Sequence, residues 1–422
     1  MTSRTINGSA GPGVRRSRAG RRWVIEGVPR DDGPVRVGVF SDSYLPRISG
    51  VVRSIEALVA ELRRQGHQAA IFAPAYPGYR DDDPDVVRFP SVRAPGIPDF
   101  PLAIPVARSF TAGLRARHLS VIHTHSPFLM GTAGLYAARR LGLPLVFTHH
   151  TMYSEYVHYV PIVSQRFSRE VVTRYTIKYC NRCSLVVAPS HAVRNWLLAR
   201  GVTARVEVLA TAGFELDRFD RLNPHWVRPR LGIPAGVPLV ITVGRLAREK
   251  RFDVLLAAFA VAAQGTPARL LVVGGGPEAA ALRRAAAERG IAGQVIFTGP
   301  LDHDRVLDCY AAADLFAFSS PTETQGLVVV EAMAAGLPVA AVGAGGVSEV
   351  VSDGLTGLLT GLDAEALGTA IRRLLGDEAL RSRLAAAGRT AAQSYAIETL
   401  TERLVGLYRH AAMVTPIVAA PD

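Results

Sequence analysis

Two glutamates flank a glycine in residues 321–338, Pro-Thr-Glu-Thr-Gln-Gly-Leu-Val-Val-Val-Glu-Ala-Met-Ala-Ala-Gly-Leu-Pro. Glu323 and Glu331 stand on either side of Gly326, which precedes an apolar, helix-forming run. A glycine here lets the backbone come close to a ligand, and the first N–H groups of the helix point toward an anion such as a diphosphate. The two carboxylates can accept hydrogen bonds from hydroxyl groups around that anion. The flanking residues favour a nucleotide-sugar site, whereas the glutamate spacing alone would indicate only an ordinary helix face.

A second candidate segment, residues 244–250, reads Gly-Arg-Leu-Ala-Arg-Glu-Lys and follows an apolar run of strand length. Its cations Arg245 and Lys250 would lie on the loop after that strand, where two positive charges can stabilise a diphosphate leaving group. Lys178 is the only other lysine in a chain that otherwise uses arginine. A lysine at this place therefore indicates a specific requirement, and the alternative is a solvated charged loop.

Several histidines lie close together in the sequence: His123, His125, His149, His150 and His158. His149 and His150 follow a predicted strand at its carboxyl end, which is the edge where open α/β sheets bind ligands. We therefore predict that His150 acts in the active site. A zinc site is an alternative, because His123 and His125 would share a strand face, but no carboxylate pattern completes it.

Three further motifs have simpler interpretations. Residues 81–85, Asp-Asp-Asp-Pro-Asp, could bind a divalent metal, but acids beside proline more commonly form a turn. The run 274–280, Gly-Gly-Gly-Pro-Glu-Ala-Ala, fits a dinucleotide fingerprint, but it does not follow the first strand of its domain. Cys180 and Cys183 have no second cysteine pair, which favours small core residues in a reducing compartment over a zinc site.

Apolar runs of strand length alternate with helical patterns along most of the chain. The expected strands are residues 35–40, 68–72, 121–123, 145–148, 185–188, 239–243, 269–273, 295–298, 315–318 and 339–341. Buried parallel strands alternating with helices predict an α/β fold with two Rossmann-like, doubly wound domains and a ligand cleft between them. The expected boundaries are a disordered basic tail (1–34), an N-terminal domain (35–212), a linker (213–235), a C-terminal domain (236–395) and a terminal helix and tail (396–422).

The composition of the 422 residues is that of a globular protein, with 49% apolar and 20% charged residues. The chain has neither an apolar run long enough to span a membrane nor the apolar region of a signal peptide, so we predict a cytoplasmic location. The net charge of +12 predicts an acidic partner, either an anionic lipid surface or nucleic acid. The basic segments contain no recognisable nucleic-acid-binding module, which disfavours the second partner.

Taken together, these motifs resemble family 4 retaining glycosyltransferases in order and spacing over about residues 35–400. The matching segments are the acceptor-side glycine loop (41–54), the catalytic-histidine segment (147–151), the diphosphate-binding segment (244–250), the donor loop (321–338) and a following glycine turn (345–349). Within the family, residues 123–131, 151–161 and 322–327 resemble the diacylglycerol glucosyltransferases in particular. Residues 209–217 depart from the pattern, because the usual proline is absent and the segment is one residue longer.

The resemblance implies a GT-B architecture and a set of site residues. The implied catalytic residues are His150, Glu323, Arg245 and Lys250. The implied donor contacts are Gly50, Gly244, Gly326, Leu327, Val328 and Glu331. The implied acceptor contacts are Tyr44, Ser49, Tyr153, Tyr156 and His158.

The resemblance also implies a reaction and a location. The expected reaction moves a hexose with retention, most simply glucose from UDP-glucose, onto a membrane lipid such as diacylglycerol, without a metal or another cofactor. The alternative is a GDP-mannose-dependent mannosyltransferase acting on a lipid, and a nucleic-acid-binding protein is a remote one. A lipid acceptor implies a cytoplasmic protein held peripherally on the inner face of the cell membrane.

Overall fold

The computed structural model describes residues 14–16, 23–25, 33–47, 49–94, 97–104, 114–150, 165–211 and 213–414. The chain divides into two compact α/β units. The first consists of Met1–Ala188, Leu197–Glu207 and Thr401–Asp422, and the second of Pro189–Trp196 and Val208–Leu400. The boundary between them falls inside the last helix, α14 (Ile397–Val414).

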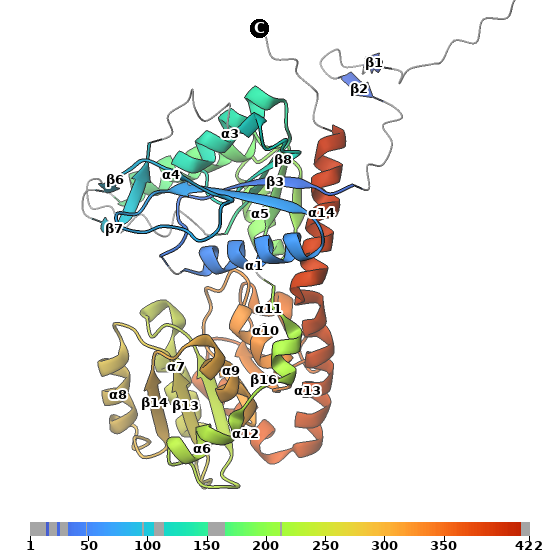
Figure 1. Cartoon of the computed structure of the whole chain (residues 1–422). Helices are drawn as coiled ribbons and strands as arrows, with labels where there is room; N and C mark the ends of the chain where they lie inside the picture. Colours follow the sequence, from blue (N-terminus) through green and yellow to red (C-terminus); the bar gives the residue numbers. More distant parts are fainter. Residues whose placement is uncertain are drawn as a thin grey trace, which may run out of the picture. The chain divides into compact units, whose positions relative to one another are not determined.

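The first unit is built on a parallel sheet, in which the described residues form seven strands in the order β11-β10-β9-β8-β3-β4-β5. Figure 1 labels β3 and β8 of this sheet. The strands are β3 (Arg36–Phe40), β4 (Gln68–Pro74), β5 (Val86–Phe89), β8 (Val121–Thr124), β9 (Leu145–Thr148), β10 (Leu185–Ala188) and β11 (Val206–Val208). The helices of this unit that follow strands are α1 (Gly50–Arg64), α3 (Leu129–Leu141) and α4 (Gln165–Cys180), and β6 (Ser91–Ala94) pairs antiparallel with β7 (Ile97–Ala103). Helix α5 (His191–Ala199) follows β10 and is divided between the two units after Trp196.

The second unit contains a parallel sheet with the order β14-β13-β12-β15-β16-β17. Its strands are β12 (Leu239–Val243), β13 (Arg269–Val273), β14 (Val295–Gly299), β15 (Leu315–Phe318), β16 (Val339–Val342) and β17 (Leu358–Thr360). Its helices are α6 (Val227–Arg230), α7 (Phe252–Ala262), α8 (Ala279–Glu288), α9 (His303–Ala312), α10 (Leu327–Ala334), α11 (Val347–Val350), α12 (Ala364–Gly376) and α13 (Glu378–Ala392). No described helix is long and apolar enough to cross a membrane.

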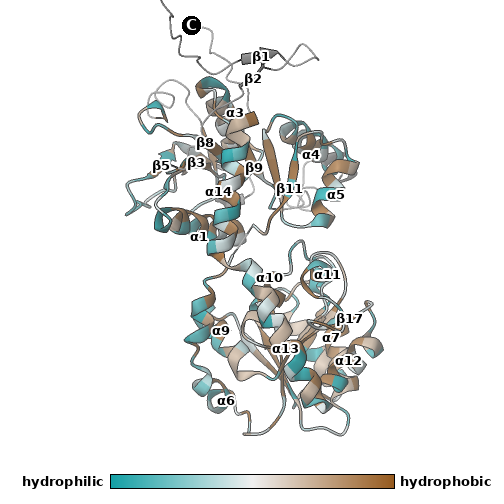
Figure 2. Cartoon of the chain, turned by 90° about the vertical axis from the view of Figure 1, so that its right-hand side faces the viewer, coloured by the Kyte–Doolittle hydropathy of each residue, from teal (hydrophilic) through white to brown (hydrophobic). Residues whose placement is uncertain are grey.

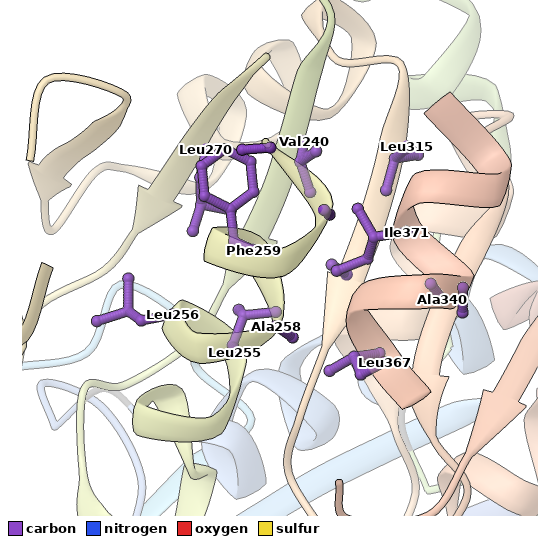
Figure 3. Close-up of a cluster of buried hydrophobic side chains, with 14 of the residues drawn as sticks. Val240, Leu255, Leu256, Ala258, Phe259, Leu270, Leu315, Ala340, Leu367 and Ile371 are labelled. Atoms are coloured by element: carbon purple, nitrogen blue, oxygen red, sulfur yellow. The ribbon is translucent and has the colours of Figure 1, made fainter. Parts of the chain in front are cut away.

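Continuous apolar strands form the core of each unit, because helices cover both faces of a parallel sheet. In the second unit, α7 contributes Leu255 and Phe259 and α12 contributes Ile371 to a cluster that packs onto Val240 and Leu270 of the sheet (Figure 3). All five side chains are buried. Figure 2 shows hydrophobic residues along the strands and hydrophilic residues on helices such as α1 and α5.

The structure confirms the predicted α/β class with two parallel sheets, and it adds detail in two regions. Within the expected tail, Val14–Arg16 (β1) and Trp23–Ile25 (β2) pair as a short antiparallel ladder, and the tail's other residues up to 32 lie outside the described part of the chain. The expected linker contains short helical turns that pack onto α9, where the Trp226 indole donates to Asp308 at 2.7 Å.

Candidate active site

The donor loop is the connection between β15 and α10 and contains Glu323. Gly326 ends this loop in a left-handed conformation (φ 67°), which a side chain rarely adopts, and α10 begins at the next residue. The glycine turn after β16 packs against the donor loop, and the Gly346 N–H donates to the Glu323 carbonyl at 2.7 Å. A Cβ at Gly345 would lie 2.4 Å from that same carbonyl oxygen, and one at Gly346 would lie 2.5 Å from the Gln325 nitrogen. The two glycines are therefore required by close backbone packing.

An ion pair joins the donor loop to the loop after β12. The Lys250 ammonium lies against the Glu323 carboxylate, and both side chains are largely buried, with 23% and 18% exposed. The Ser319 hydroxyl also donates to the Lys250 carbonyl at 3.0 Å. Strands β12 and β15 are neighbours in the parallel sheet, so their carboxyl ends bring these loops together. The structure thus unites two of the predicted catalytic residues.

Arg245 lies on the same edge of the second unit and is exposed. Its carbonyl accepts from the Ala247 N–H at 2.9 Å, and its guanidinium has no hydrogen-bond or ion-pair partner among the described residues. The glycine run after β13 holds its loop in place. A Cβ at Gly274 would lie 2.0 Å from the Gly244 carbonyl oxygen, and one at Gly276 would lie 2.3 Å from that of Leu246. The glycines that mimic a dinucleotide fingerprint therefore serve the close approach of two loops.

Glu331 lies on α10 and is buried, with 9% of its surface exposed. Its Oε2 atom is 3.0 Å from the hydroxyl of Tyr310 on α9, which also lies 3.2 Å from the Val328 carbonyl oxygen. Burial and the neighbouring Glu331 raise the pKa of Tyr310 well above its usual value, so this phenol remains a donor. Tyr310 therefore orients the carboxylate expected to bind ribose.

Leu327 and Val328 are the first residues of α10, and both are half-buried. The N–H groups of the first helical turn have no acceptor within the helix. They supply partial positive charge beside the donor loop, as expected for an anion site.

In the first unit, His150 lies just after β9 and contacts a cluster of histidines. Its Nε2 atom is 2.7 Å from Nδ1 of His125, which follows the neighbouring strand β8. His123 is hydrogen bonded through Nδ1 to Tyr408 and through Nε2 to Thr148, both at 2.7 Å. Burial lowers the pKa of His150 to about 3, with a further contribution from His149, so the ring is neutral at physiological pH.

Comparisons with known proteins agree with this geometry. Residues 227–391 match the model of glycosyl transferases group 1, and residues 48–212 match that of glycosyltransferase family 4. The chain is 34% identical to a GDP-mannose-dependent alpha-mannosyltransferase of Mycobacterium tuberculosis, over 89% of this chain and 96% of that protein. It is also 34% identical to an alpha-monoglucosyldiacylglycerol synthase of Streptococcus pneumoniae, over 77% of this chain and 75% of that protein.

The chain belongs to the family 4 glycosyltransferases. It is a hexosyltransferase that depends on a nucleotide sugar. Sucrose-phosphate synthase from Thermosynechococcus elongatus matches with a TM-score of 0.68 and 25% identity, over 89% of this chain and 98% of that one. The Anabaena protein HepE in complex with UDP matches with a TM-score of 0.69 at 23% identity, over 88% of this chain and 99% of that one. These matches confirm the predicted GT-B fold.

The residues expected on the acceptor side of this family 4 glycosyltransferase have mixed placements. Ser49 caps α1 by accepting from the Val52 N–H at 3.3 Å. Gly50, which was expected as a donor contact, is the first residue of that helix and belongs to the first unit, whereas the other expected donor contacts belong to the second. Tyr44 is buried under the Arg88 guanidinium, and burial raises its pKa to about 12. The other three expected acceptor residues, Tyr153, Tyr156 and His158, lie outside the described residues.

The structure of the glycosyltransferase adds residues that the sequence did not single out. Asp42, just after β3, is buried and accepts from the Ser126 hydroxyl and from the Met130 N–H at 2.8 Å, and burial raises its pKa. Gln325 in the donor loop accepts from the Thr211 hydroxyl at 3.0 Å. Asp42 lies in the acceptor-side glycine loop (41–54) and Gln325 in the donor loop (321–338). Their position in these two segments is the only sequence feature that could have pointed to them.

The metal-binding alternatives find no support in the described part of this glycosyltransferase. No group of three or more His, Cys, Asp or Glu residues suited to a metal occurs there. The acids of residues 81–85 pair with arginines instead: Asp81 with Arg88 at 2.6 Å and Asp83 with Arg63 at 2.7 Å. Those ion pairs account for the Asp-x-Asp motif as a structural turn.

Proposed function

We propose that this glycosyltransferase moves glucose from UDP-glucose, with retention of configuration, onto a membrane lipid such as diacylglycerol. The observation that carries the proposal is the ion pair of Lys250 and Glu323 beside the exposed Arg245 on one sheet edge. This arrangement supports the proposal, because two cations on one loop can stabilise a diphosphate leaving group and the neighbouring carboxylate can accept a hydrogen bond from a sugar hydroxyl. The likeness to alpha-monoglucosyldiacylglycerol synthases of Streptococcus pneumoniae and Acholeplasma laidlawii supports the choice of sugar and acceptor.

In the proposed mechanism the acceptor hydroxyl attacks from the face that the leaving phosphate occupies. The acceptor oxygen bonds to the anomeric carbon, the bond to the phosphate breaks, and a phosphate oxygen takes the hydroxyl proton. Arg245, Lys250 and the N–H groups at the start of α10 stabilise the charge on the leaving group. The mechanism uses no covalent nucleophile. The Glu323 carboxylate pairs with Lys250, and the Glu331 carboxylate is buried on α10 beside Tyr310. No metal is needed in this scheme, since the protein supplies the cations.

The remaining roles concern orientation. Glu331 would bind the ribose hydroxyls, Glu323 a hydroxyl of the donor sugar, and His150 its primary hydroxyl. The two carboxylates can accept hydrogen bonds from hydroxyl groups, and the neutral imidazole offers one donor and one acceptor.

A second candidate is a GDP-mannose-dependent mannosyltransferase. The Mycobacterium tuberculosis relative of that name is 34% identical to this chain, as is the Streptococcus pneumoniae relative, and the match covers a larger share of it. In this proposal the base of the nucleotide would be held largely through the backbone, so the side chains described above do not distinguish the two donors.

The deciding experiment incubates purified protein with radiolabelled UDP-glucose, UDP-galactose or GDP-mannose and a mixture of lipids, followed by thin-layer chromatography. Label from UDP-glucose in a lipid that co-migrates with glucosyldiacylglycerol supports the proposal. Label from GDP-mannose alone supports the second candidate, and release of free sugar without a labelled lipid contradicts a lipid acceptor.

We further propose that the protein binds anionic membranes peripherally through basic residues of the tail and of α4. Val171 and Tyr175 on α4 are exposed, at 48% and 39%, beside Arg174 and Lys178. The exposed apolar surface of α4 does not extend to Tyr179, because that residue is buried and its hydroxyl donates to the Thr124 hydroxyl at 2.9 Å. Exposed apolar and basic side chains on one helix favour the interface of an anionic bilayer.

A further inference from the structure

The ends of two neighbouring strands place two histidine rings against each other. His125 follows β8 directly, and His150 lies two residues beyond the end of β9, which pairs in parallel with β8. The rings are stacked, with centroids 5.0 Å apart and planes inclined by 23°, and Nδ1 of His125 lies 2.7 Å from Nε2 of His150. This distance is that of a strong hydrogen bond, which requires one and only one proton between the two nitrogens.

The protonation of the two rings is linked as a result. Burial lowers the pKa of both imidazoles, so each ring is neutral and has a single N–H. If Nδ1 of His125 carries the shared proton, His150 must have its own proton on Nδ1. If Nε2 of His150 carries the shared proton, His125 must have its proton on Nε2. The two rings therefore have the same tautomer in either case.

The His125 ring also contacts the ring of His123. The His123 ring lies 4.1 Å from it, between centroids, and is itself fixed by hydrogen bonds to Tyr408 and Thr148. The backbone N–H of His125 donates to the Phe40 carbonyl at 2.8 Å. Since His125 is almost fully buried, with 3% of its surface exposed, it has little freedom to change orientation.

We propose that His125 is a positioning residue that couples the tautomer of His150 to its own and holds the orientation of that ring, and so sets whether Nδ1 of His150 donates to or accepts from a sugar hydroxyl. This inference rests on the proposed role of His150. With the wrong tautomer, Nδ1 of His150 and the oriented ligand hydroxyl would both be donors or both be acceptors, and the hydrogen bond between them would be lost.

The direct test is ¹⁵N NMR of the full-length protein with selectively labelled histidines, assigned by single substitutions. We expect the His125 and His150 rings to show the same tautomer in the wild-type protein. In His125→Leu, which removes the partner, the ring of His150 should show a mixture of tautomers, whereas the exposed-site control His225→Asn should leave it unchanged. Different tautomers on the two wild-type rings, or an unchanged His150 ring in His125→Leu, would overturn the inference.

A kinetic comparison tests the link to transfer. Asparagine at residue 125 keeps a hydrogen-bonding group near the position of Nδ1, whereas leucine does not. We expect His125→Leu to lower kcat about 10- to 100-fold with little change in the KM for the nucleotide sugar, and His125→Asn to restore most of it. His150→Ala combined with His125→Leu should be no slower than His150→Ala alone, because the first residue acts through the second.

The outcomes separate this inference from the proposed function. If His150→Ala is impaired while His125→Leu keeps wild-type kcat, or if the two losses multiply, His125 does not act through His150. Wild-type transfer by His150→Ala would instead refute the proposed role of His150, and the tautomer measurement would still decide whether the two rings are linked. Circular dichroism and thermal unfolding establish that each variant is folded.

Discussion

Lys250 and Glu323 form an ion pair although they are 73 residues apart in the sequence. The pair lies where a diphosphate is expected, so a bound donor would compete with Glu323 for the ammonium. A compact ammonium can serve both partners in turn, whereas a planar guanidinium prefers to hold the carboxylate with two hydrogen bonds.

This difference predicts the effect of Lys250→Arg. We expect the arginine variant to fold normally and to turn over nucleotide sugar about tenfold or more slowly, because the guanidinium remains on Glu323. Lys178→Arg is a matched control, since it replaces the only other lysine. Steady-state kinetics decide the matter, and wild-type turnover of the Lys250 variant would show that any positive charge suffices.

The buried Glu331 gives a prediction for donor binding. Glu331→Ala should weaken the binding of UDP by about 1.5–3 kcal/mol, because the ribose hydroxyls lose a charged acceptor. Glu331→Asp should recover only part of the loss. Tyr310→Phe, which removes the phenol that orients the carboxylate, should have a smaller effect in the same direction. Isothermal titration calorimetry measures all three, with the exposed Glu288→Ala of α8 as control. Unchanged affinity in Glu331→Ala would remove this residue from the site.

The glycine turn below the donor loop predicts a steric effect without any change of charge. In Gly346→Ala the new methyl group would lie 2.5 Å from the Gln325 nitrogen, so the donor loop must shift. We expect weaker UDP binding and a lower melting temperature of the second unit. Gly361→Ala is the control, because a Cβ there meets nothing within 4 Å. Equal behaviour of the two variants would mean that the loop moves without cost.

The buried histidines predict a loss of stability in mild acid. Burial lowers the pKa of His123 and His150 to about 3 and that of His149 to about 4. The unfolded chain binds these protons near pH 6.5 while the folded unit does not, so stability is complete above pH 6.5 and falls as the pH drops toward 4. Each of the three rings costs up to about 2 kcal/mol at pH 5.

Hydrogen-exchange mass spectrometry of peptides from β8 and β9 can follow this loss between pH 7.5 and 5, after correction for the intrinsic exchange rate. The slope of the unfolding free energy against pH gives the number of protons taken up on unfolding. Removing one buried ring, as in His149→Asn, should reduce that number by about one. Replacing the exposed His225 with asparagine should leave the slope unaltered. A slope that stays the same in both variants would contradict the account.

Membrane binding gives the last prediction. The protein should sediment with vesicles that contain anionic lipid, and added salt should release it, because basic residues contribute about 1 kcal/mol each before screening. Deletion of residues 1–34 should weaken sedimentation without abolishing transfer to an acceptor solubilised in detergent. Equal sedimentation with neutral and anionic vesicles at low salt would exclude an electrostatic attachment.

The sequence predicted the buried strands best. The observed limits of β9, β10, β12, β13 and β15 equal the expected ones, because each is a largely apolar run that is followed by a polar residue, a proline or a glycine. It missed β5, β11 and β17, which are short and only partly buried at the sheet edges. Edge strands lack the two-sided burial that makes a central strand conspicuous.

The sequence was sufficient to propose which residues form the candidate site, but not which other residues they contact. Glu331 could be proposed from its place after Gly326, but its contact with Tyr310 depends on how α9 packs against α10. The ion pair of Lys250 with Glu323 likewise depends on β12 and β15 being neighbours in the sheet. The order of strands in a sheet cannot be predicted from local sequence patterns. Spacing within one segment is visible in a sequence, whereas contacts between segments require the fold.

The position of Tyr408 has a consequence for how the chain reaches its final state during synthesis. This residue is the hydrogen-bond partner of His123, yet it is made 285 residues later, after the whole second unit. Until Tyr408 has been translated, His123 therefore lacks this hydrogen-bond partner. The first unit to be started is thus the last to be completed, and a nascent chain that ends before Thr401 would contain every residue of the second unit but not the last part of the first.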